Sequence, residues 1–534
     1  MAQAAVRTST TTDTRTKTMA LPRSMGFFAT FVFAIATIGL ASSGLTPFST
    51  ILGQYPGIPF LGILAAGGLI CLVNAYVYSV IGAAVRRSGA DYILASRVIH
   101  PVAAFALSFS MVIFSGLVLG KVIAQIAQSV LPVFMRSVSI IAQVPAMMLS
   151  ADAIASPQGV SIAGAILVVI VFALSILPSQ VNHRILQVGF GLVLLGWGVI
   201  FFQFLLPVSS FQQAWDHFMG VGTYEMQVQM ARELGMTDAS GSQANWIGGL
   251  LIAFWLYFGF QAPAFLAGEV KNPARNLFAA SAGSVLLTLA VIGLGTVALF
   301  RLVPQDWLSA QSYLYLSGKS AMPWITFYAA ILRPDPFQIT FLTLVWVYSF
   351  INIVQAYFLI CSRIILAWAE DGIVPSAAGY VHPRLKSPLV GVLVIAILTQ
   401  LGVMVTAQTQ ASVSADFGFI FFAILTQLLP VLAALLMPFL KKGWFSSTGG
   451  FVRARIGPLP LISLFSLVLL GYFGWLLFEV FSTPAIFAQA SLSFIVLGIV
   501  FVAGILIFLL RWLYKRSKGI DLMETFRSFP NPHD

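Results

Sequence analysis

The chain has 534 residues, of which 59% are hydrophobic and only 8% are charged, and its mean hydropathy is +0.94. Soluble domains carry about 25% charged residues, so this composition excludes a soluble globular domain and indicates a polytopic membrane protein. The net charge of +11 does not indicate a nucleic-acid partner, because most basic residues lie between apolar runs. Cys71 and Cys361 both lie inside such runs, which argues against a disulfide framework.

The amino-terminal segment, residues 1–25, is threonine-rich and weakly basic, and no apolar core begins before Phe27. We interpret it as a disordered cytoplasmic tail, with a transit peptide as the alternative. Apolar runs bounded by proline, glycine and charge then predict twelve membrane spans. They cover roughly residues 27–51, 59–84, 101–130, 160–178, 184–206, 246–269, 277–302, 339–366, 389–407, 415–438, 459–482 and 487–511.

The lysine and arginine residues predict the sidedness of these spans. An even number of spans places both termini on one side, and the tails and loops of that side contain 22 of the 28 lysine and arginine residues. By the positive-inside rule, that side is the cytoplasm. We therefore expect an integral, multi-pass protein, of the plasma membrane, with both termini cytoplasmic and with no nucleic-acid partner.

The first span contains Gly39, Ser42, Ser43, Gly44 and Pro47 in its middle. Glycine and proline disfavour a continuous helix, so an interruption is expected. Inside hydrocarbon an unwound backbone must face protein or a water-filled cavity, and its free amides suit a substrate carboxylate. The alternative is that the small residues only allow another helix to approach closely.

Two features follow before the middle of the chain. Residues 86–101 (RRSGADYILASRVIHP) predict a short amphipathic helix capped by Ser88 and Asp91, which we interpret as a structural gate element rather than a binding site. Lys121 is the only basic residue well inside an apolar run, and intramembrane charge is costly, so it is a functional candidate. The alternative is a lysine that snorkels to the outer interface, since it lies about 30 Å beyond Pro101 along a straight helix.

The sixth span follows a long loop, residues 207–245, which we predict to be extracellular. Within the span, Gly259, Gln261 and Pro263 fall close together and predict a second interruption. A proline-kinked helix with nothing bound is the alternative. Interruptions at corresponding positions of two halves are typical of a midplane binding site in inverted-repeat transporters.

Several of these segments resemble the amino acid, polyamine and organocation (APC) superfamily. GFQAPAFLAGEVKNPARN, residues 259–276, is similar to its sixth transmembrane segment, with Gln261 in place of the usual glutamate. Ser42, Ser43 and Gly44 resemble its GSG motif with the first glycine replaced, and SGADYILASRVIHP resembles its loop after the second span. Residues 362–388 (SRIILAWAEDGIVPSAAGYVHPRLKSP) closely resemble the loop after its eighth span.

The resemblance implies an all-α polytopic protein with 12 transmembrane helices and an inverted, LeuT-like 5+5 repeat. The repeats would be residues 26–206 and 246–438, followed by two peripheral helices in 439–511 and a cytoplasmic tail, 512–534. It also implies a secondary active transporter that moves an amino acid or related amine by alternating access. The implied substrate-binding residues are Ser42, Ser43, Gly44, Trp255, Tyr257, Phe258, Gly259, Gln261 and Tyr357, with Phe260 beside them as the aromatic most suited to packing.

The coupling ion is predicted from two groups that the sequence lacks, a carboxylate at position 261 and hydroxyl ligands in the eighth span. Gln261 cannot titrate near neutral pH, and Ser349 is the only serine or threonine between residues 344 and 361, too few hydroxyls for a sodium site. Lys121 is therefore the predicted coupling residue and a proton the predicted coupling ion, because burial makes a lysine ammonium easier to deprotonate. Obligate amino acid or polyamine exchange and a non-transporting nutrient sensor are the alternatives.

Catalysis and cofactors are not expected. The five histidines form no HExxH motif and no histidine–aspartate cluster, so we predict no enzyme activity, no metal site and no cofactor. The predicted partners are a small-molecule substrate, a coupling ion and the lipid bilayer.

Overall fold

The computed structural model describes residues 21, 23–43, 47–205, 210–237, 243–320, 323–409 and 414–529. Across these ranges the fold is helical, and the only sheet is a hairpin of β1 (Arg455–Ile456) and β2 (Leu459–Pro460). Ten helices are long and apolar enough to cross a membrane. The chain is therefore an all-α polytopic membrane protein, as its composition predicts.

The long helices follow the predicted apolar runs closely, because each contains an apolar stretch of 18 residues with at most two charged side chains. They are α4 (Phe60–Val85), α6 (Pro101–Gln125) with its continuation, α9 (Pro157–Ser175), α10 (Ser179–Leu205), α15 (Pro273–Leu302), α18 (Pro336–Glu370), α19 (Leu389–Thr409), α20 (Ser414–Leu440), α22 (Leu461–Ser482) and α23 (Pro484–Ser517).

The first and sixth predicted spans are the two that break. The first consists of α1 (Phe27–Ile38), α2 (Leu40–Ser43), the π-helical turn η1 (Pro47–Ile51) and α3 (Leu52–Gln54). The sixth consists of α13 (Gln243–Tyr257) and the single turn α14 (Ala262–Phe265). Glycine residues with positive φ separate the pieces, Gly39 at +72° and Gly259 at +120°, a backbone conformation that residues with a Cβ rarely adopt.

The third span is longer than predicted. Instead of ending near residue 130, α6 continues through a π-helical turn, η2 (Ile126–Val130), into α7 (Leu131–Ala142), and the apolar span extends from Pro101 to Ser139. Pro132 suggests an end to the helix in the sequence, but it lies in the first turn after η2, where its missing N–H is tolerated. Lys121 consequently lies in the middle of this helical run rather than near its end.

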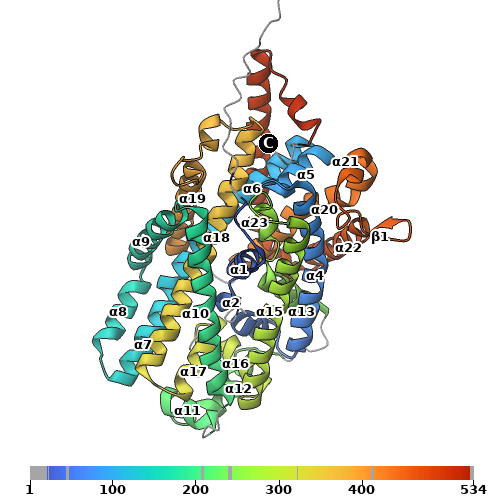
Figure 1. Cartoon of the computed structure of the whole chain (residues 1–534). Coiled ribbons are helices and arrows are strands. Elements are labelled where there is room, and N and C mark those ends of the chain that lie inside the picture. The colour runs from blue at the N-terminus through green and yellow to red at the C-terminus, as the bar shows by residue number, and fades with distance from the viewer. Residues whose placement is uncertain are drawn as a thin grey trace, which may run out of the picture.

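Shorter helices cover both ends of the bundle (Figure 1). At one end lie α5 (Ala90–Val98), η3 (Ser376–Gly379), α21 (Lys442–Ser447) and η4 (Leu522–Phe526). This end carries Arg86, Arg87 and Arg97 and the last turn of α23, and we call it the basic end. The opposite end is covered by α8 (Ala146–Ala155), α11 (Phe211–Met219), α12 (Thr223–Glu233), α16 (Gln305–Leu316) and α17 (Ile325–Leu332).

Aromatic side chains hold the helices of the opposite end together. Trp307 of α16 lies 4.8 Å from Trp215 of α11 and 4.9 Å from Tyr224 of α12, ring centre to ring centre. Trp215 and Trp307 are buried, so this cluster has its own small core. The described part of the predicted loop, residues 210–237, thus consists mainly of two packed helices.

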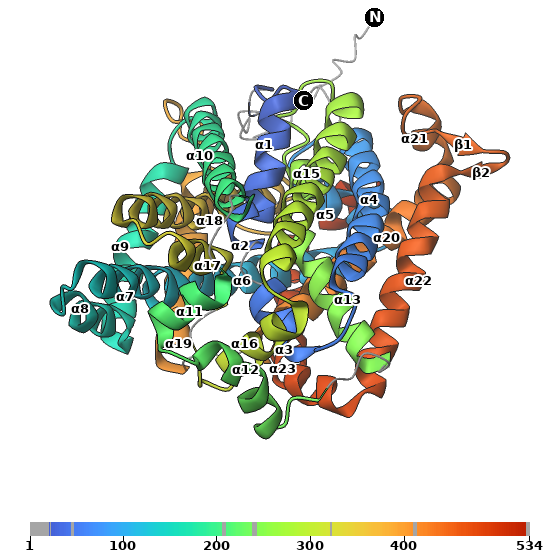
Figure 2. The same ribbon diagram turned by 90° about the horizontal axis from the view of Figure 1, so that it is seen from below.

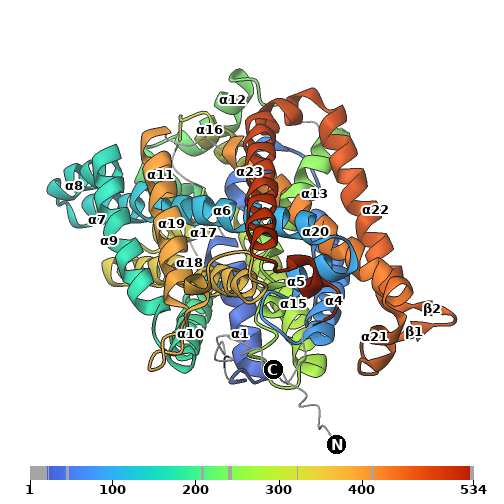
Figure 3. The same ribbon diagram turned by 90° about the horizontal axis from the view of Figure 1, so that it is seen from above.

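The middle of the bundle is formed by α1, which packs against α10, α15 and α18. In both end-on views, α22 and the β1–β2 hairpin lie on one side of the molecule and α7 and α8 on the other (Figures 2 and 3). One very close helix crossing joins α6 to α19, where a Cβ on Gly120 would lie 2.4 Å from backbone atoms of Thr399, Gly402 and Val403. Small residues of this kind let two helix backbones approach within a bilayer.

We predict that Gly120→Ala lowers the thermal stability of the purified protein, because its Cβ meets rigid backbone rather than a movable side chain. Gly198→Ala on α10 is the matched control, since nothing lies within 4 Å of its Cβ and alanine is favoured over glycine in a helix by about 1 kcal/mol. Melting temperatures of both variants in detergent check this. Equal melting temperatures for the two variants would contradict the close crossing of α6 and α19.

Candidate functional site

The two helix breaks are in direct contact with each other. The Thr37 hydroxyl at the end of α1 lies 2.8 Å from the Gly259 carbonyl oxygen and 2.9 Å from the Phe33 and Ala34 carbonyl oxygens of its own helix, so its one proton is shared among three acceptors. A Cβ on Gly259 would lie only 2.5 Å from the Thr37 carbonyl carbon. The two interrupted helices therefore cross at their breaks, and only glycine fits at position 259.

The second break satisfies part of its own backbone. Gly259 follows the end of α13, and its N–H donates to the Gln261 side-chain carbonyl Oε1 at 3.0 Å. Gln261 is buried, so this carboxamide supplies an acceptor that an uninterrupted helix would have supplied from its backbone. The Gly259–Gln261 segment consequently pairs one of its free backbone groups with its own side chain.

The first break is described only in part. Gly39 donates its N–H to the Ile35 carbonyl, and the half-buried Ser42 donates its hydroxyl to the Gly39 carbonyl at 2.8 Å. Ser43 is the last residue of α2, and Gly44 lies outside the described residues. Among the predicted carboxylate-binding residues, the structure thus places Ser42 and the backbone of Ser43 directly after the α1 break.

The predicted aromatic residues differ in their surroundings. Trp255 and Phe258 stack on each other with ring centres 5.3 Å apart, and both are half-buried. Tyr257 is fully buried and donates its hydroxyl to the Leu64 carbonyl of α4 at 2.9 Å. Phe260 is fully buried as well. The Trp255–Phe258 pair therefore keeps exposed ring surface, while Tyr257 fastens α13 to α4.

Two further predicted residues lie on other helices. Tyr357 is half-buried on α18, which packs against both α1 and α14. Lys121 is half-buried on α6, which packs against α18, α19 and α23. The hydrogen bonds that define the crossing come from α1 and from the segment between α13 and α14.

A buried ion pair lies between the crossing and the basic end. Arg363 of α18 donates from Nε to Oε1 of Glu269 at 2.9 Å, and both side chains are at most 2% exposed. The second carboxylate oxygen of Glu269 accepts the Ser179 hydroxyl of α10 at 3.2 Å. The Met25 N–H, just before α1, donates to the Glu269 carbonyl at 3.0 Å. Glu269 thus joins the start of α1 to α10 and α18.

A second buried ion pair lies at the basic end itself. Arg97 of α5 donates two hydrogen bonds, of 2.6 and 2.7 Å, to the two carboxylate oxygens of Asp371 at the end of α18. The Tyr92 hydroxyl donates to the same carboxylate at 2.7 Å. Burial alone lowers the pKa of Arg97, but the hydrogen bonds and charge of Asp371 outweigh it and raise the pKa above its ordinary value.

The helix α5 is also bonded to the second break. The Gly89 N–H, at the start of α5, donates to the Phe265 carbonyl of α14 at 2.9 Å. Together with the two ion pairs, this bond closes the basic end around α5, α14 and α18. Each of these residues lies in one of the motif segments of the sequence. The pairing of the charges could not be predicted, because the paired residues lie 94 and 274 positions apart in the chain.

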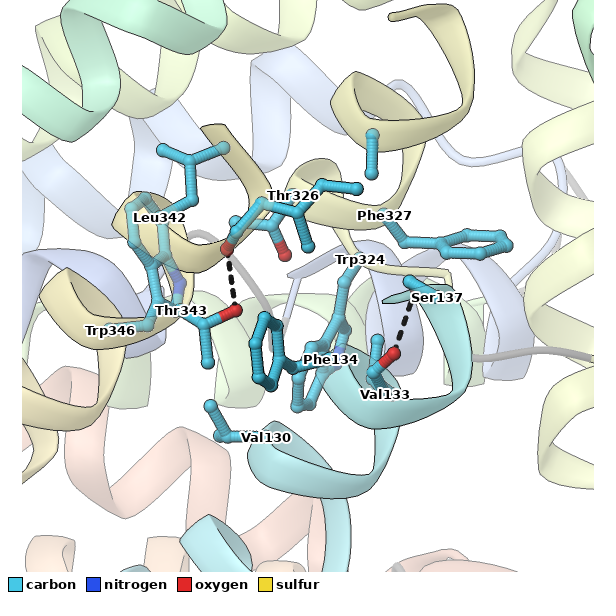
Figure 4. Close-up of a pocket in the computed structure, with 12 residues that line it drawn as sticks. Val130, Val133, Phe134, Ser137, Trp324, Thr326, Phe327, Leu342, Thr343 and Trp346 are labelled. Atoms are coloured by element: carbon cyan, nitrogen blue, oxygen red, sulfur yellow. Dashed lines mark hydrogen bonds between the residues drawn. The ribbon is translucent and has the colours of Figure 1, made fainter. Parts of the chain in front are cut away.

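One described cavity lies away from the crossing, between α7, α17 and the start of α18 (Figure 4). It is lined mainly by apolar and aromatic side chains, among them Phe134, Trp324 and Trp346. Two of its hydroxyls, of Ser137 and Thr343, donate to carbonyls of their own helices at 2.8 Å. It offers few free polar groups to a zwitterion, so we do not assign the substrate there.

The fold and its crossing define a class of protein: a multi-pass helical membrane protein with two interrupted helices in contact. The family model for amino acid permeases matches residues 25–514, nearly the whole chain. The chain therefore belongs to the amino acid permease family, within the APC superfamily whose motifs it resembles. This is a family of transporters, not of enzymes, and its members act on small-molecule substrates within a lipid bilayer. No cluster of potential metal ligands occurs among the described residues.

We predict that Glu269→Gln strongly destabilises the protein, because it leaves the buried Arg363 guanidinium without its counter-charge. Breaking a buried pair costs about 3–5 kcal/mol. The control is Asp152→Asn, which removes an ion pair with Arg136 whose side chains are 61% and 50% exposed, and such pairs contribute at most about 1 kcal/mol. Thermal unfolding of both variants measures the difference, and a Glu269→Gln protein as stable as the control would contradict the assignment.

Proposed function

We propose that this protein is a secondary active transporter that moves an amino acid or a related amine across the plasma membrane by alternating access. The observation that carries the proposal is the contact of the two helix breaks through Thr37 and Gly259. Interrupted helices that meet at mid-bundle offer free amides and carbonyls to a polar substrate, which continuous helices cannot do.

The proposed architecture has twelve spans, counting the ten long helices and the two broken ones. Each broken span then opens a set of five, residues 26–206 and 246–438, in an inverted LeuT-like repeat. The helices α22 and α23 stand outside both sets, which agrees with the peripheral place of α22 in Figures 2 and 3. The basic end would face the cytoplasm, since it holds the excess of lysine and arginine.

In the proposed complex, backbone amides at Ser42, Ser43 and Gly44 bind the substrate carboxylate. The segment from Gly259 to Gln261 supplies carbonyl groups for the amine. Positive helix dipole ends favour the carboxylate at the first break. Trp255 and Phe258, with Tyr357 of α18, would form the wall around the substrate side chain, whereas Tyr257 supports this wall from behind through Leu64.

Alternating access requires that the basic end open and close. In this structure it is closed, because the Arg97–Asp371 and Arg363–Glu269 pairs are intact and buried. Opening would hydrate both pairs, and the hydration free energy of the four charges offsets part of the electrostatic attraction that is lost. We propose that these pairs form the inner gate of the transporter.

We predict that the purified protein takes up radiolabelled amino acid into proteoliposomes and that Trp255→Ala reduces uptake by roughly tenfold to a hundredfold, as expected for the loss of a buried aromatic contact worth about 1.4–3 kcal/mol. The control is Trp475→Ala, because Trp475 is 39% exposed on the peripheral helix α22. Equal loss of uptake in both variants at equal protein yield would refute the proposed wall.

The proposed energy source is a proton gradient, with Lys121 as the carrier. We expect an imposed pH gradient to drive uptake by the wild-type protein and to have little effect on Lys121→Ala. A response only to substrate preloaded inside the vesicles would instead establish obligate exchange. Substrate-induced thermal stabilisation without any uptake would establish a sensor, since ligand binding alone stabilises the folded state. A gradient that drives both proteins equally would remove Lys121 from the mechanism.

A further inference from the structure

A candidate site separate from the crossing lies around Asp91, in the first turn of α5. Its side chain is buried, and its Oδ1 atom has no hydrogen-bond partner. The carboxylate accepts hydrogen bonds from the backbone N–H groups of Tyr92 and of Asp91 itself, as expected at a helix amino terminus. The prediction that Ser88 and Asp91 cap this helix is wrong, because Gly89 occupies the N-cap position of α5 and no side chain makes a cap hydrogen bond there.

Asp91 lines a small cavity between α5, α6 and α20. Thr426 and Pro430 of α20 line the same cavity. Because Pro430 has no N–H, the Thr426 carbonyl four residues earlier lacks its usual helical donor. The Thr426 hydroxyl cannot compensate, since it donates to the Ala423 carbonyl. The Thr426 carbonyl is thus an acceptor on a helix that lines the cavity, and an ionised Asp91 adds further acceptors and no donor.

The remaining polar groups around the cavity are already engaged. Ser108 of α6 donates to the Phe105 carbonyl and accepts from Trp368 of α18. On α5 and at the end of α18, Tyr92, Arg97 and Asp371 bond to one another. Two other titratable groups lie near, Tyr78 of α4 beside Asp91 and Glu370 of α18 beside Asp371 and Arg97, and the lining residues of α6 and α20 carry no charge.

Burial is the main influence on the Asp91 carboxyl. It raises the pKa of Asp91 from its ordinary value of 3.8 to about 7, and the two backbone hydrogen bonds offset this only in part. The group is thus balanced between its protonated and ionised forms in the physiological range.

We propose that Asp91 is a proton-binding site that holds α5 against α20 and so controls the closure of the basic end. A protonated carboxyl carries the hydrogen-bond donor that the cavity lacks, whereas an ionised one requires water around it. The idea rests on the proposed function only in treating closure of this end as a step of transport; the protonation of Asp91 itself needs no substrate.

The direction of the effect follows from the two pKa values. The closed state holds the proton more tightly than an open, hydrated state, so closing takes up a proton. Closure is therefore favoured most at acid pH, weakens as the pH rises from about 4 to about 7, and changes little above that. Within this window the ratio of open to closed protein rises at most about tenfold for each pH unit.

The test is the accessibility of a cysteine at position 95, a buried residue of α5 that lines the same cavity. Ala95→Cys protein, purified in detergent without substrate, is labelled with a hydrophilic maleimide between pH 5.5 and 7.5. Labelling of Ser446→Cys, an exposed position at the same end, corrects for the intrinsic pH dependence of the thiol. Both reporters are then combined with Asp91→Asn, which imitates the protonated carboxyl, and with Glu524→Gln, which removes an exposed carboxylate of the same end.

We expect the corrected labelling of position 95 to fall about tenfold between pH 7.5 and 5.5 with Asp91 present or with Glu524→Gln. With Asp91→Asn it should stay at the low, acid value throughout. The same pH dependence with and without Asp91, or none in either, overturns the proposal. Hydrogen–deuterium exchange of the α5 amides, with and without Asp91→Asn, repeats the test without a cysteine. Since neither measurement requires uptake, a failure of the proposed transport activity is distinguishable from a failure here.

Discussion

The crossing of the two broken helices depends on a hydrogen bond from the Thr37 hydroxyl to the Gly259 carbonyl. In hydrocarbon each unpaired backbone group costs several kcal/mol, so a break can persist only where side chains or neighbouring backbone replace the lost helical bonds. Thr37, Ser42 and Gln261 supply these replacements close to the glycines that turn the chain. The same constraint explains why glycine occupies position 259, where any Cβ would enter the backbone of α1.

The ion pairs of the basic end solve a different problem, that of alignment. A buried pair adds little net stability over a well-packed apolar contact, because both charges lose their hydration. What it adds is specificity, since a misplaced helix would leave a charge buried and unpaired. Glu269 couples the start of α1 to α18, and Asp371 couples α18 to α5. The pairs therefore fix how α5, α18 and the start of α1 meet on the basic-end side of the crossing.

Much of the fold could be predicted from the sequence, because a bilayer imposes a simple rule on length and hydropathy. The rule finds the long helices, and Gly39, Gly259 and Pro263 reveal the two breaks. It fails where structure depends on distant contacts. The continuation of α6 beyond residue 130 depends on a π-helical turn before Pro132, and α11 and α16 form because Trp215 and Trp307 pack together. Asp91 shows the same limit, since the sequence suggests a helix cap, whereas Gly89 is the N-cap and Asp91 lines a cavity that includes Pro430 of α20.

The helix α5 carries both the Arg97 ion pair and the proposed proton site. Their free energies show how much each contributes to the proposed gate. One pH unit changes the balance between open and closed states by at most about 1.4 kcal/mol for a single carboxyl. Removing one partner of a buried ion pair costs about 3–5 kcal/mol, more than a shift of two pH units supplies. Loss of the proton from Asp91 can therefore bias the proposed gate toward opening but cannot open it alone. Under the proposed function, the remaining free energy would come from a substrate bound at the crossing, and the Gly89–Phe265 hydrogen bond links that site to α5 through α14. A gate built this way responds to pH strongly only when its substrate site has already shifted the balance.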